Sequence, residues 1–555
     1  MISYPFKATL AFLLSACHFA ANSSTMPKSS LLDSTTHYDL DLLSNTGPTV
    51  SNAINKTITN GGKKALDELL LNPSDNSDEL IARQASIKFF LERQALTAAL
   101  KDQLLIAAHN ESSLEEPSDE LGKKSFERVY FSSSRFKHLN TSTYGLDLAY
   151  VMSICATCAP LFEHALMHIL IDLFDKRKEP NLLPAAPCNH GGPCNNDHNH
   201  GHQHDAPRSA CPVPHKESTS PHIYYMLQAT HWGLHLPRLY SMACDVKHQA
   251  EMVKYVQHRM IKVADYIHAA ESIYTLLEKN KADQINFKPL TDLHHFFGKH
   301  QTCSQDFKQL STLLSKQTFT GHASLFNHVG NVLAALALFN KVEKECAAIT
   351  KAISEIDVYL NIAELCAQQT SQAPWCFVTL SNHENPHIQL RNVRHLFVPN
   401  SRPLNFSSDD GAHTVIMGDN GSGKSTYTFS IGHAVILAQT FGIAPAESCV
   451  LTPFSHICTF RLIQDNMPEG ISRFYAECAR VQKIIDIIQS NSKRALVLFD
   501  EPFTYTTAQK GSVRLQTMLS DLSMSRKTIS LVVTHYHDIG ATKEGSWNKV
   551  YLGAR

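Results

Sequence analysis

Residues 418–425 read Gly-Asp-Asn-Gly-Ser-Gly-Lys-Ser, and this spacing of glycine, lysine and serine can wrap a row of phosphates. The residues Thr414–Met417 before it predict a buried strand, and Thr426–Phe441 after it have helical spacing. In that setting the glycines let backbone N–H groups and the helix N-terminus face the phosphates. Lys424 would reach the terminal phosphates, and the Ser425 hydroxyl would bind Mg²⁺. The order of strand, loop and helix favours a phosphate-binding loop over a glycine turn beside an unrelated lysine.

Two acidic side chains follow a second predicted strand. Ala495–Phe499 is an unbroken apolar run, which is typical of a parallel strand buried on both faces, and Asp500 and Glu501 come directly after it. Ligands of open α/β sheets bind at this end of the strands. We expect Asp500 to hold Mg²⁺ and Glu501 to orient or deprotonate the attacking water. A third strand, Ile529–Val533, would bring His535 to the same edge, so the sequence predicts an ATPase that uses ATP and Mg²⁺.

The composition allows several domains and excludes a strongly basic chain. With 555 residues there is room for two to four domains. The formal net charge is −1, so any DNA binding must come from a local patch or from enclosure. The 14 cysteines have no regular short spacing, which predicts reduced and mostly buried thiols in place of a disulfide scaffold.

The N-terminus has the layout of a secretory signal. Met1–Lys7 carries one lysine, Ala8–Leu14 is apolar, and Leu14–Cys17 resembles a bacterial lipoprotein cleavage box. A short unstructured leader, or a wrongly assigned start, also fits residues 1–36. Because ATP is a cytoplasmic substrate, we expect a cytoplasmic catalytic part, with lipid attachment at Cys17 as the alternative.

Residues 37–372 are mainly helical in pattern, and residues 373–555 read as an α/β domain. Apolar residues recur at three-and-four spacing in the helical part. The predicted helices are Ser51–Leu71, Asp78–Leu105, Glu251–Lys279, Thr302–Lys316 and Leu325–Cys366. Asn60-Gly61-Gly62 is expected to interrupt the first of them. Leu146–Phe174 is apolar but carries acidic and histidine side chains, so a buried helix is expected there and a membrane span is not.

Residues 187–215 form a histidine- and cysteine-rich segment with too few apolar residues to bury, so an exposed loop is expected. Alternating histidines beside cysteines can hold Zn²⁺, Ni²⁺ or Cu²⁺. Their spacing matches no folded zinc module, so loose binding is expected. The candidate ligands are Cys188, His190, Cys194, His198, His200, His202 and His204.

The chain resembles the MutS family, the ATPases of DNA mismatch recognition. The loop's ending, Asn-Gly-Ser-Gly-Lys-Ser-Thr-Tyr, is similar to the family's loop, and Phe397–Asn400 resembles the segment whose aromatic ring stacks on adenine. Gly470–Glu477 is similar to a signature whose serine, here Ser472, reaches the nucleotide of the neighbouring subunit, and Thr534–Tyr536 matches a further motif. With the loop, the resemblance assigns the nucleotide to Gly418, Asn420, Gly421, Gly423, Lys424, Ser425, Thr426 and Phe397.

Weaker resemblance to the lever domain of MutS begins at Tyr38 and returns at Ile356–Cys366, while residues 110–300 match nothing recognisable. No segment before Tyr38 resembles the family's mismatch-reading domain, so DNA binding without mismatch selectivity is expected. The family's Gly-Arg-Gly run is replaced here by Pro502–Thr507. This loss argues against the communication between subunits that the resemblance would otherwise imply.

The sequence therefore predicts a helical lever and core domain followed by a doubly wound α/β ATPase domain. By resemblance it would form a homodimer through the ATPase domain and couple ATP hydrolysis to clamping DNA, in mismatch repair or recombination. Two alternatives remain open: a membrane-attached ATPase with another partner, and a nucleotide-gated scaffold with little turnover.

Overall fold

The computed structural model describes residues 31–33, 35–43, 47–115, 129–130, 137–176, 221–320, 328–370, 374–398, 401–409, 412–461, 473–490, 493–536 and 547–553. The chain forms two compact units and combines helices with an α/β sheet. The first unit comprises Met1–Glu115, Lys262–Lys308 and Val342–Arg555, and the second comprises Glu116–Ile261 and Gln309–Lys341. The domain limits expected at residues 36 and 372 stay predictions.

A five-stranded parallel sheet is the centre of the α/β part of the first unit. Its order is β11, β5, β10, β9, β8, and each neighbouring pair is parallel. The strands are β5 (His413–Gly418), β8 (His456–Phe460), β9 (Ala495–Asp500), β10 (Thr528–Val533) and β11 (Trp547–Leu552). Almost every residue of β5, β9 and β10 is buried, because both faces of the sheet are covered. The three strands predicted from unbroken apolar runs are therefore present, each within one residue of its predicted limits.

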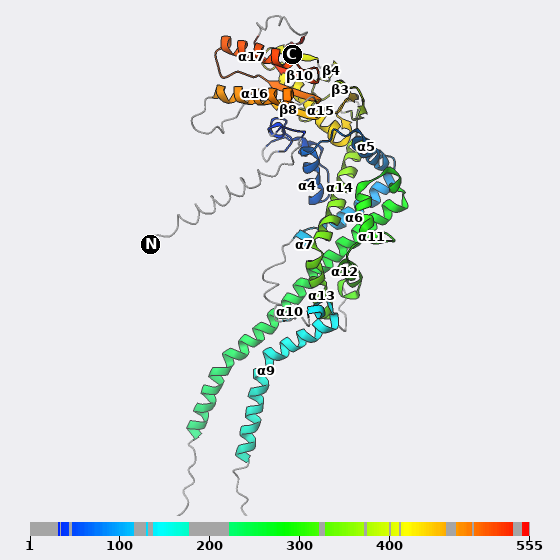
Figure 1. Cartoon of the computed structure of the whole chain (residues 1–555). Helices are drawn as coiled ribbons and strands as arrows, with labels where there is room; N and C mark the ends of the chain where they lie inside the picture. Colours follow the sequence, from blue (N-terminus) through cyan, green and yellow to red (C-terminus); the bar gives the residue numbers. More distant parts are fainter. Residues whose placement is uncertain are drawn as a thin grey trace, which may run out of the picture. The chain divides into compact units, whose positions relative to one another are not determined.

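Helices cover both faces of this sheet. They are α15 (Lys424–Phe441), α16 (Arg473–Ser490) and α17 (Ala508–Ser523). Val497 and Phe499 of β9 join α16 and α17 in one apolar core. Leu498 points to the opposite face, where a Cβ on Gly432 of α15 would lie 2.9 Å from its Cδ1 atom. Figure 1 shows these three helices around β8 and β10.

Two smaller sheets join the same unit. The four-stranded sheet has the order β2, β7, β3, β4, and the two-stranded sheet pairs β1 with β6. Their strands are β1 (Cys376–Phe377), β2 (Thr379–Leu380), β3 (His387–Val393), β4 (Leu404–Asp409), β6 (Ile443–Ala444) and β7 (Ser448–Leu451).

The helical part of the first unit is more interrupted than its sequence pattern suggested. Its helices are α2 (Thr36–Asp39), α3 (Val50–Ile54), α4 (Asn60–Leu71), α5 (Ser77–Leu91), α6 (Gln94–Asn110), α7 (Ser112–Glu115), α11 (Lys288–Phe297) and α14 (Glu343–Ala367), with a 3₁₀ turn η2 (Ala282–Ile285). The helix predicted over residues 51–71 is two helices, the one over 78–105 divides after Leu91, and the one over 325–366 divides near Val342.

The break predicted at Asn60-Gly61-Gly62 is present but lies directly before these residues, between α3 and α4, because α4 begins at Asn60. The Asp357 carboxylate of α14 accepts the Thr59 N–H at 2.7 Å and the Thr59 hydroxyl at 2.8 Å. Glu111 accepts the N–H groups of Asn60 and Gly61 at 2.9 and 2.7 Å. A Cβ at Gly62 would lie 2.3 Å from an Asp357 oxygen. The glycines therefore allow α4 to approach these buried carboxylates, which satisfy its first N–H groups.

Residues 31–33 and 35–43, which we call the N-terminal strap, lie against the edge strand β8. Leu32 forms a parallel bridge with Ile457 of that strand. Leu40 of the strap is fully buried and lies close to Gly432 of α15. The strap therefore adds to the sheet from a segment more than 400 residues away in the chain.

The second unit is helical. It contains η1 (Lys137–Thr141), α9 (Thr143–Lys176), η3 (Gln317–Phe319), α13 (His328–Lys341), the part of α10 (Pro221–Lys279) up to Ile261 and most of α12 (Gln305–Leu314). α13 packs on α9, and the Gly330 N–H donates to Asp147 at 2.9 Å. In Figure 1, α9 is the cyan helix.

The expectation of a buried helix over Leu146–Phe174 is half wrong. The helix forms, but Leu148, Phe162 and Ile169 are 62%, 71% and 57% exposed. Helix α9 packs on α13 and η1, and an apolar pattern by itself does not say whether a partner covers the rest of a helix. In the part of the chain that the structure describes, no helix is both long and apolar enough to cross a membrane.

Replacing Asp357 with alanine should lower the free energy of unfolding by about 3 kcal/mol, since the start of α4 then loses a buried charged acceptor. Chemical denaturation of the purified protein measures this change. The matched control is Glu343→Ala, whose side chain is exposed on the first turn of the same helix. It should change the free energy of unfolding by no more than about 0.5 kcal/mol. Equal losses in the two variants would contradict the capping role of Asp357.

Candidate functional site

The glycine loop, residues 418–425, joins β5 to α15 at the carboxyl edge of the parallel sheet. Gly421 and Gly423 have φ angles of +78° and +92°, which residues with a Cβ rarely adopt. Lys424 is buried, and its Nζ atom donates to the carbonyls of Gly418 and Asp419 at 2.9 and 3.0 Å. The lysine is therefore folded back over the loop, with its charge inside the curve of the backbone.

Asp500 ends β9 and meets the loop directly. The Ser425 hydroxyl donates to Asp500 Oδ1 at 2.9 Å. Burial raises the pKa of Asp500, while the Ser425 hydrogen bond and the charges of Arg461 and Lys424 lower it. A hydroxyl and a carboxylate held together at a phosphate-binding loop are the oxygen donors that Mg²⁺ takes when phosphates and water complete its shell. The two residues predicted as Mg²⁺ ligands are thus in contact.

Glu501 and His535 form the second half of this edge. Glu501 has a φ of +53°, and its N–H donates to the Val533 carbonyl at 3.0 Å. This turn brings its carboxylate into contact with His535 Nε2, and both side chains are about one-third exposed. A carboxylate at a solvent-accessible edge beside a histidine can accept a proton from water.

A cavity of about 170 Å³ opens at this pair. Its lining residues are Glu501, Pro502, Thr504, Thr506, Ala508, Thr534, His535 and Tyr536. The Tyr536 hydroxyl donates to the Phe503 carbonyl at 2.8 Å, which ties the loop after β9 to the loop after β10. The segment 502–507, where the family's Gly-Arg-Gly run is absent, therefore forms one wall of the cavity.

The signature segment is only partly described. Ser472 lies outside the described residues, so its predicted role stays a prediction. Glu477, in the same segment, is fully buried and contacts the Thr504 hydroxyl and the Tyr505 N–H, each at 3.4 Å. Burial raises the pKa of Glu477. This residue links α16 to the cavity wall.

Phe397, the predicted adenine-stacking residue, belongs to a cluster of three rings. Its ring centroid lies 5.0 Å from that of His433 and 5.3 Å from that of His395. His433 is fully buried, and its Nε2 atom lies 2.9 Å from the Leu40 carbonyl. Because a carbonyl only accepts, Nε2 carries the proton. Burial lowers the pKa of His433 to about 3, so the ring is neutral at neutral pH while its Nε2–H donates to the strap.

Arg461 is a residue of this edge that the sequence reasoning missed. Arg461 directly follows β8, just as Asp500 ends β9. Recognition of His456–Phe460 as a strand in the sequence would therefore have pointed to Arg461. Its Nη1 atom donates to Asp41 Oδ2 of the N-terminal strap at 2.9 Å. The guanidinium also lies 4.9 Å from the ring centre of Phe429 on α15.

The remaining predicted residues divide into two groups. Asn420 lies in the exposed turn of the glycine loop, and Thr426 is half-buried in the first turn of α15. The candidate metal ligands between Cys188 and His204, and the candidate lipid site Cys17, lie outside the described residues. Within the residues that are described, no group of three or more histidine, cysteine or acidic side chains is placed to hold a metal ion.

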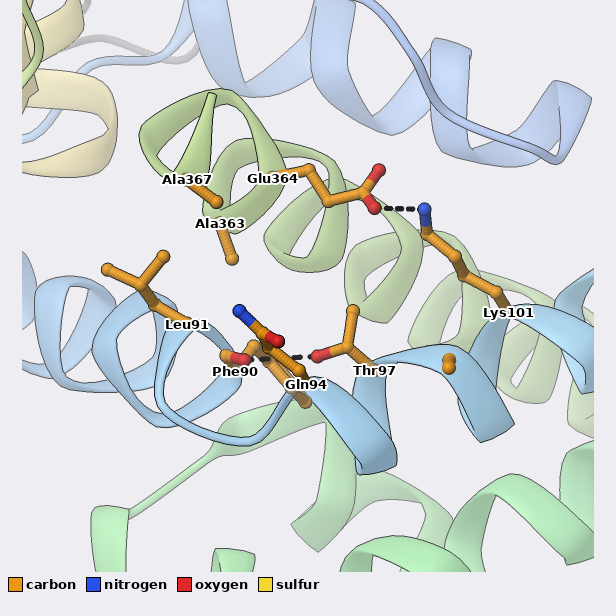
Figure 2. Close-up of a pocket in the computed structure, with 9 residues that line it drawn as sticks. Phe90, Leu91, Gln94, Thr97, Lys101, Ala363, Glu364 and Ala367 are labelled. Atoms are coloured by element: carbon orange, nitrogen blue, oxygen red, sulfur yellow. Dashed lines mark hydrogen bonds and ion pairs between the residues drawn. The ribbon is translucent and has the colours of Figure 1, made fainter. Parts of the chain in front are cut away.

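A separate cavity of about 240 Å³ lies between the helices of the first unit, beside Phe90, Leu91 and Ala363. Figure 2 shows Lys101 of α6 and Glu364 of α14 meeting as an ion pair at its edge. The charges of Lys101 and Glu364 neutralise each other, and the cavity lies away from the carboxyl edge of the sheet. This cavity therefore adds no reactive group to the candidate site.

The comparison with known proteins agrees with this geometry. The family described as MutS domain V matches residues 414–551, which span the sheet from β5 to β11. The C-terminal part of this chain belongs to the MutS family. The chain is similar to the DNA mismatch repair protein Msh6 of Gallus gallus, with 27% identity over 38% of this chain and 16% of the relative. It is also similar to the DNA mismatch repair protein MutS of Solibacter usitatus, with 28% identity over 42% of this chain and 29% of the relative.

A third MutS relative, from Staphylococcus epidermidis, is 29% identical over 34% of this chain and 21% of its own length. The chain thus matches less than a third of the length of these relatives. The matching family places Lys424, Ser425, Asp500, Glu501 and His535 within one MutS domain V.

Acid should destabilise the protein through His433. Its pKa is lower in the folded protein than the ordinary value of 6.5, so the unfolded chain takes up a proton first and stability falls as the pH drops below 6.5. Between pH 7 and 5.5, His433→Gln should lose about 1 kcal/mol less unfolding free energy than the unsubstituted protein. Urea denaturation at both pH values measures this. His300→Gln, at an exposed position, is the control and should keep the original loss.

Proposed function

We propose that this chain is a Mg²⁺-dependent ATPase of MutS type, with a helical lever and core domain and a doubly wound P-loop ATPase domain. The observation that carries the proposal is the 2.9 Å contact between Ser425 of the glycine loop and Asp500 at the end of β9. It brings the predicted phosphate-binding and metal-binding groups together at the ligand edge of a parallel sheet.

Each residue has one part in the proposed reaction. The backbone of the loop, with Gly421 and Gly423, binds the phosphates, and Lys424 neutralises their charge. Ser425 and Asp500 would hold Mg²⁺, which supplies charge neutralisation on the phosphate oxygens. Glu501 accepts the proton of the attacking water, and His535 orients the Glu501 carboxylate through their contact. The resemblance adds Phe397 as the ring that stacks on adenine.

Two substitutions separate binding from hydrolysis. Lys424→Ala should abolish ATP binding, because the phosphates lose their buried cation. Glu501→Gln should keep ATP binding and lower turnover by about 100-fold or more, since the water loses its proton acceptor while Asp500 remains. Calorimetric titration of ATP and phosphate release measure the two effects.

The control for the lysine variant is Lys510→Ala, which removes an exposed lysine of α17. It should leave both binding and turnover unchanged. Turnover of the Glu501 variant within a few-fold of the unsubstituted protein would remove Glu501 from the proposed mechanism.

DNA is the partner we propose for this ATPase, because its relatives Msh6 and MutS are DNA mismatch repair proteins. The charge of the second unit restricts where phosphates can bind. Helix α9 has no lysine or arginine from Thr143 to Asp175. Helix α10 instead exposes Arg238, Lys247 and Lys254. We therefore assign the contacts with the DNA phosphates to α10. Contacts with phosphates depend on charge and do not distinguish base sequences.

Replacing Arg238, Lys247 and Lys254 together with glutamine should weaken DNA binding and reduce the slope of log Kd against log salt by about 3. Fluorescence anisotropy with a labelled duplex at several salt concentrations measures this. A single mismatch in the duplex should change Kd by less than about threefold, well below the effect of base readout. A slope that the triple variant leaves unchanged would contradict this assignment.

The homodimer through the ATPase domain, with Ser472 reaching the partner's nucleotide, remains part of the proposal, as does a cytoplasmic location. A second candidate function is a nucleotide-gated scaffold with a protein partner. It is favoured by the apolar side chains that α9 exposes at Leu148, Cys155, Phe162 and Ile169, seven residues apart as in a coiled-coil seam. Absence of DNA binding even at low salt would favour this second candidate.

A further inference from the structure

Arg461 stands at the same level of the sheet as Asp500. Strands β8 and β9 are parallel, and their last paired residues are Phe460 and Phe499. Arg461 follows Phe460, and Asp500 follows Phe499. The Cα atoms of Arg461 and Asp500 therefore lie about 5 Å apart on neighbouring strands. Both phenylalanines face the core with α16 and α17, so the next residue on each strand faces α15.

The contacts of both side chains agree with that direction. Asp500 accepts from Ser425 in the first turn of α15, and the Arg461 guanidinium lies over Phe429, one turn further along the same helix. The charge of Arg461 also lowers the pKa of Asp500, as does the charge of Lys424. Arg461 is therefore a second cation beside the candidate Mg²⁺ ligand.

The N-terminal strap holds one end of this guanidinium. Arg461 Nη1 donates to Asp41 Oδ2 at 2.9 Å and contacts the Asp39 carbonyl at 3.4 Å. A guanidinium has five N–H donors, and in the described part of the chain no other acceptor bonds those of Arg461. The side chain is 39% exposed, so donors remain for a ligand at the sheet edge.

Asp41 is held firmly in place for this contact. Its φ is +49°, and its carbonyl accepts the Val50 N–H at 2.9 Å. Leu40 and Leu42 on either side are fully buried, and the Leu40 carbonyl contacts His433 of α15. The strap therefore presents one acidic side chain to Arg461 from a fixed backbone.

We propose that Arg461 is a phosphate-positioning residue of the nucleotide site and that Asp41 of the N-terminal strap competes with the terminal phosphate of ATP for its guanidinium. The inference rests on the proposed ATP site. A phosphate oxygen beside Asp500 draws the guanidinium from Asp41, because charge-assisted bonds to phosphate are stronger than a partly exposed ion pair. The strap is then released from its ionic contact when the triphosphate binds.

The test is calorimetric titration of Mg²⁺-ATP and Mg²⁺-ADP into the full chain. Arg461→Met should raise the Kd of ATP about tenfold or more and that of ADP much less, because ADP lacks the terminal phosphate. Asp41→Asn should lower the Kd of ATP about threefold, since the competitor is removed. In the Arg461→Met background, the Asp41 substitution should have no effect.

Asp33→Asn is the matched control. Like Asp41→Asn, it replaces an aspartate of the strap with asparagine. Asp33 instead pairs with Lys483 of α16 at 3.1 Å, so the Kd of ATP should not change. Weaker ATP binding in Asp41→Asn, or equal changes for ATP and ADP in Arg461→Met, would overturn the inference. If Lys424→Ala loses ATP binding while both Arg461 and Asp41 variants keep it, the proposed function stands and this inference fails. If Lys424→Ala also keeps ATP binding, the proposed function itself fails.

Discussion

The parallel register of β8, β9 and β10 is the constraint on which the candidate site depends. Because these strands run in one direction and end together, the residues that follow them meet at one edge. Arg461, Asp500 and His535 reach that edge from three strands whose other residues are almost all buried. A slip of β9 by one residue would turn Asp500 from α15 toward the core with α16 and α17, and the contact with Ser425 would be lost.

Helix α15 connects this edge to the helical part of the first unit. Its 18 residues span about 27 Å, from Lys424 in the glycine loop to Phe441. At the far end, the Gln84 side chain of α5 donates to the carbonyls of Val378 and Gly442 at 2.7 and 2.8 Å. Gln439 likewise exchanges hydrogen bonds with Ser74 before α5. Helix α15 thus joins the glycine loop at one end to α5 and the residues before it at the other.

The sequence predicted those parts of the fold that local pattern determines. The unbroken apolar runs of β5, β9 and β10 and the glycine loop depend on neighbours in sequence, and they were correct within a residue or so. The capping of α4 by Asp357 and Glu111, and the ion pair of Arg461 with Asp41, depend on partners 50 to 420 positions away. The exposure of α9 was not predictable for the same reason, since burial is decided by the partner and not by the helix.

The bridge between Leu32 and Ile457 has a consequence for handling the protein. Strand β8 is the last strand of the sheet on its side, and its backbone would otherwise present unpaired N–H and C=O groups. Unprotected edges of this kind pair readily with other chains and lead to aggregation. A chain begun after Leu43 would leave β8 uncovered together with the apolar surface under Leu40 and Leu42. The strap is therefore also a guard against edge-to-edge association, and truncations intended to isolate the ATPase part should retain it.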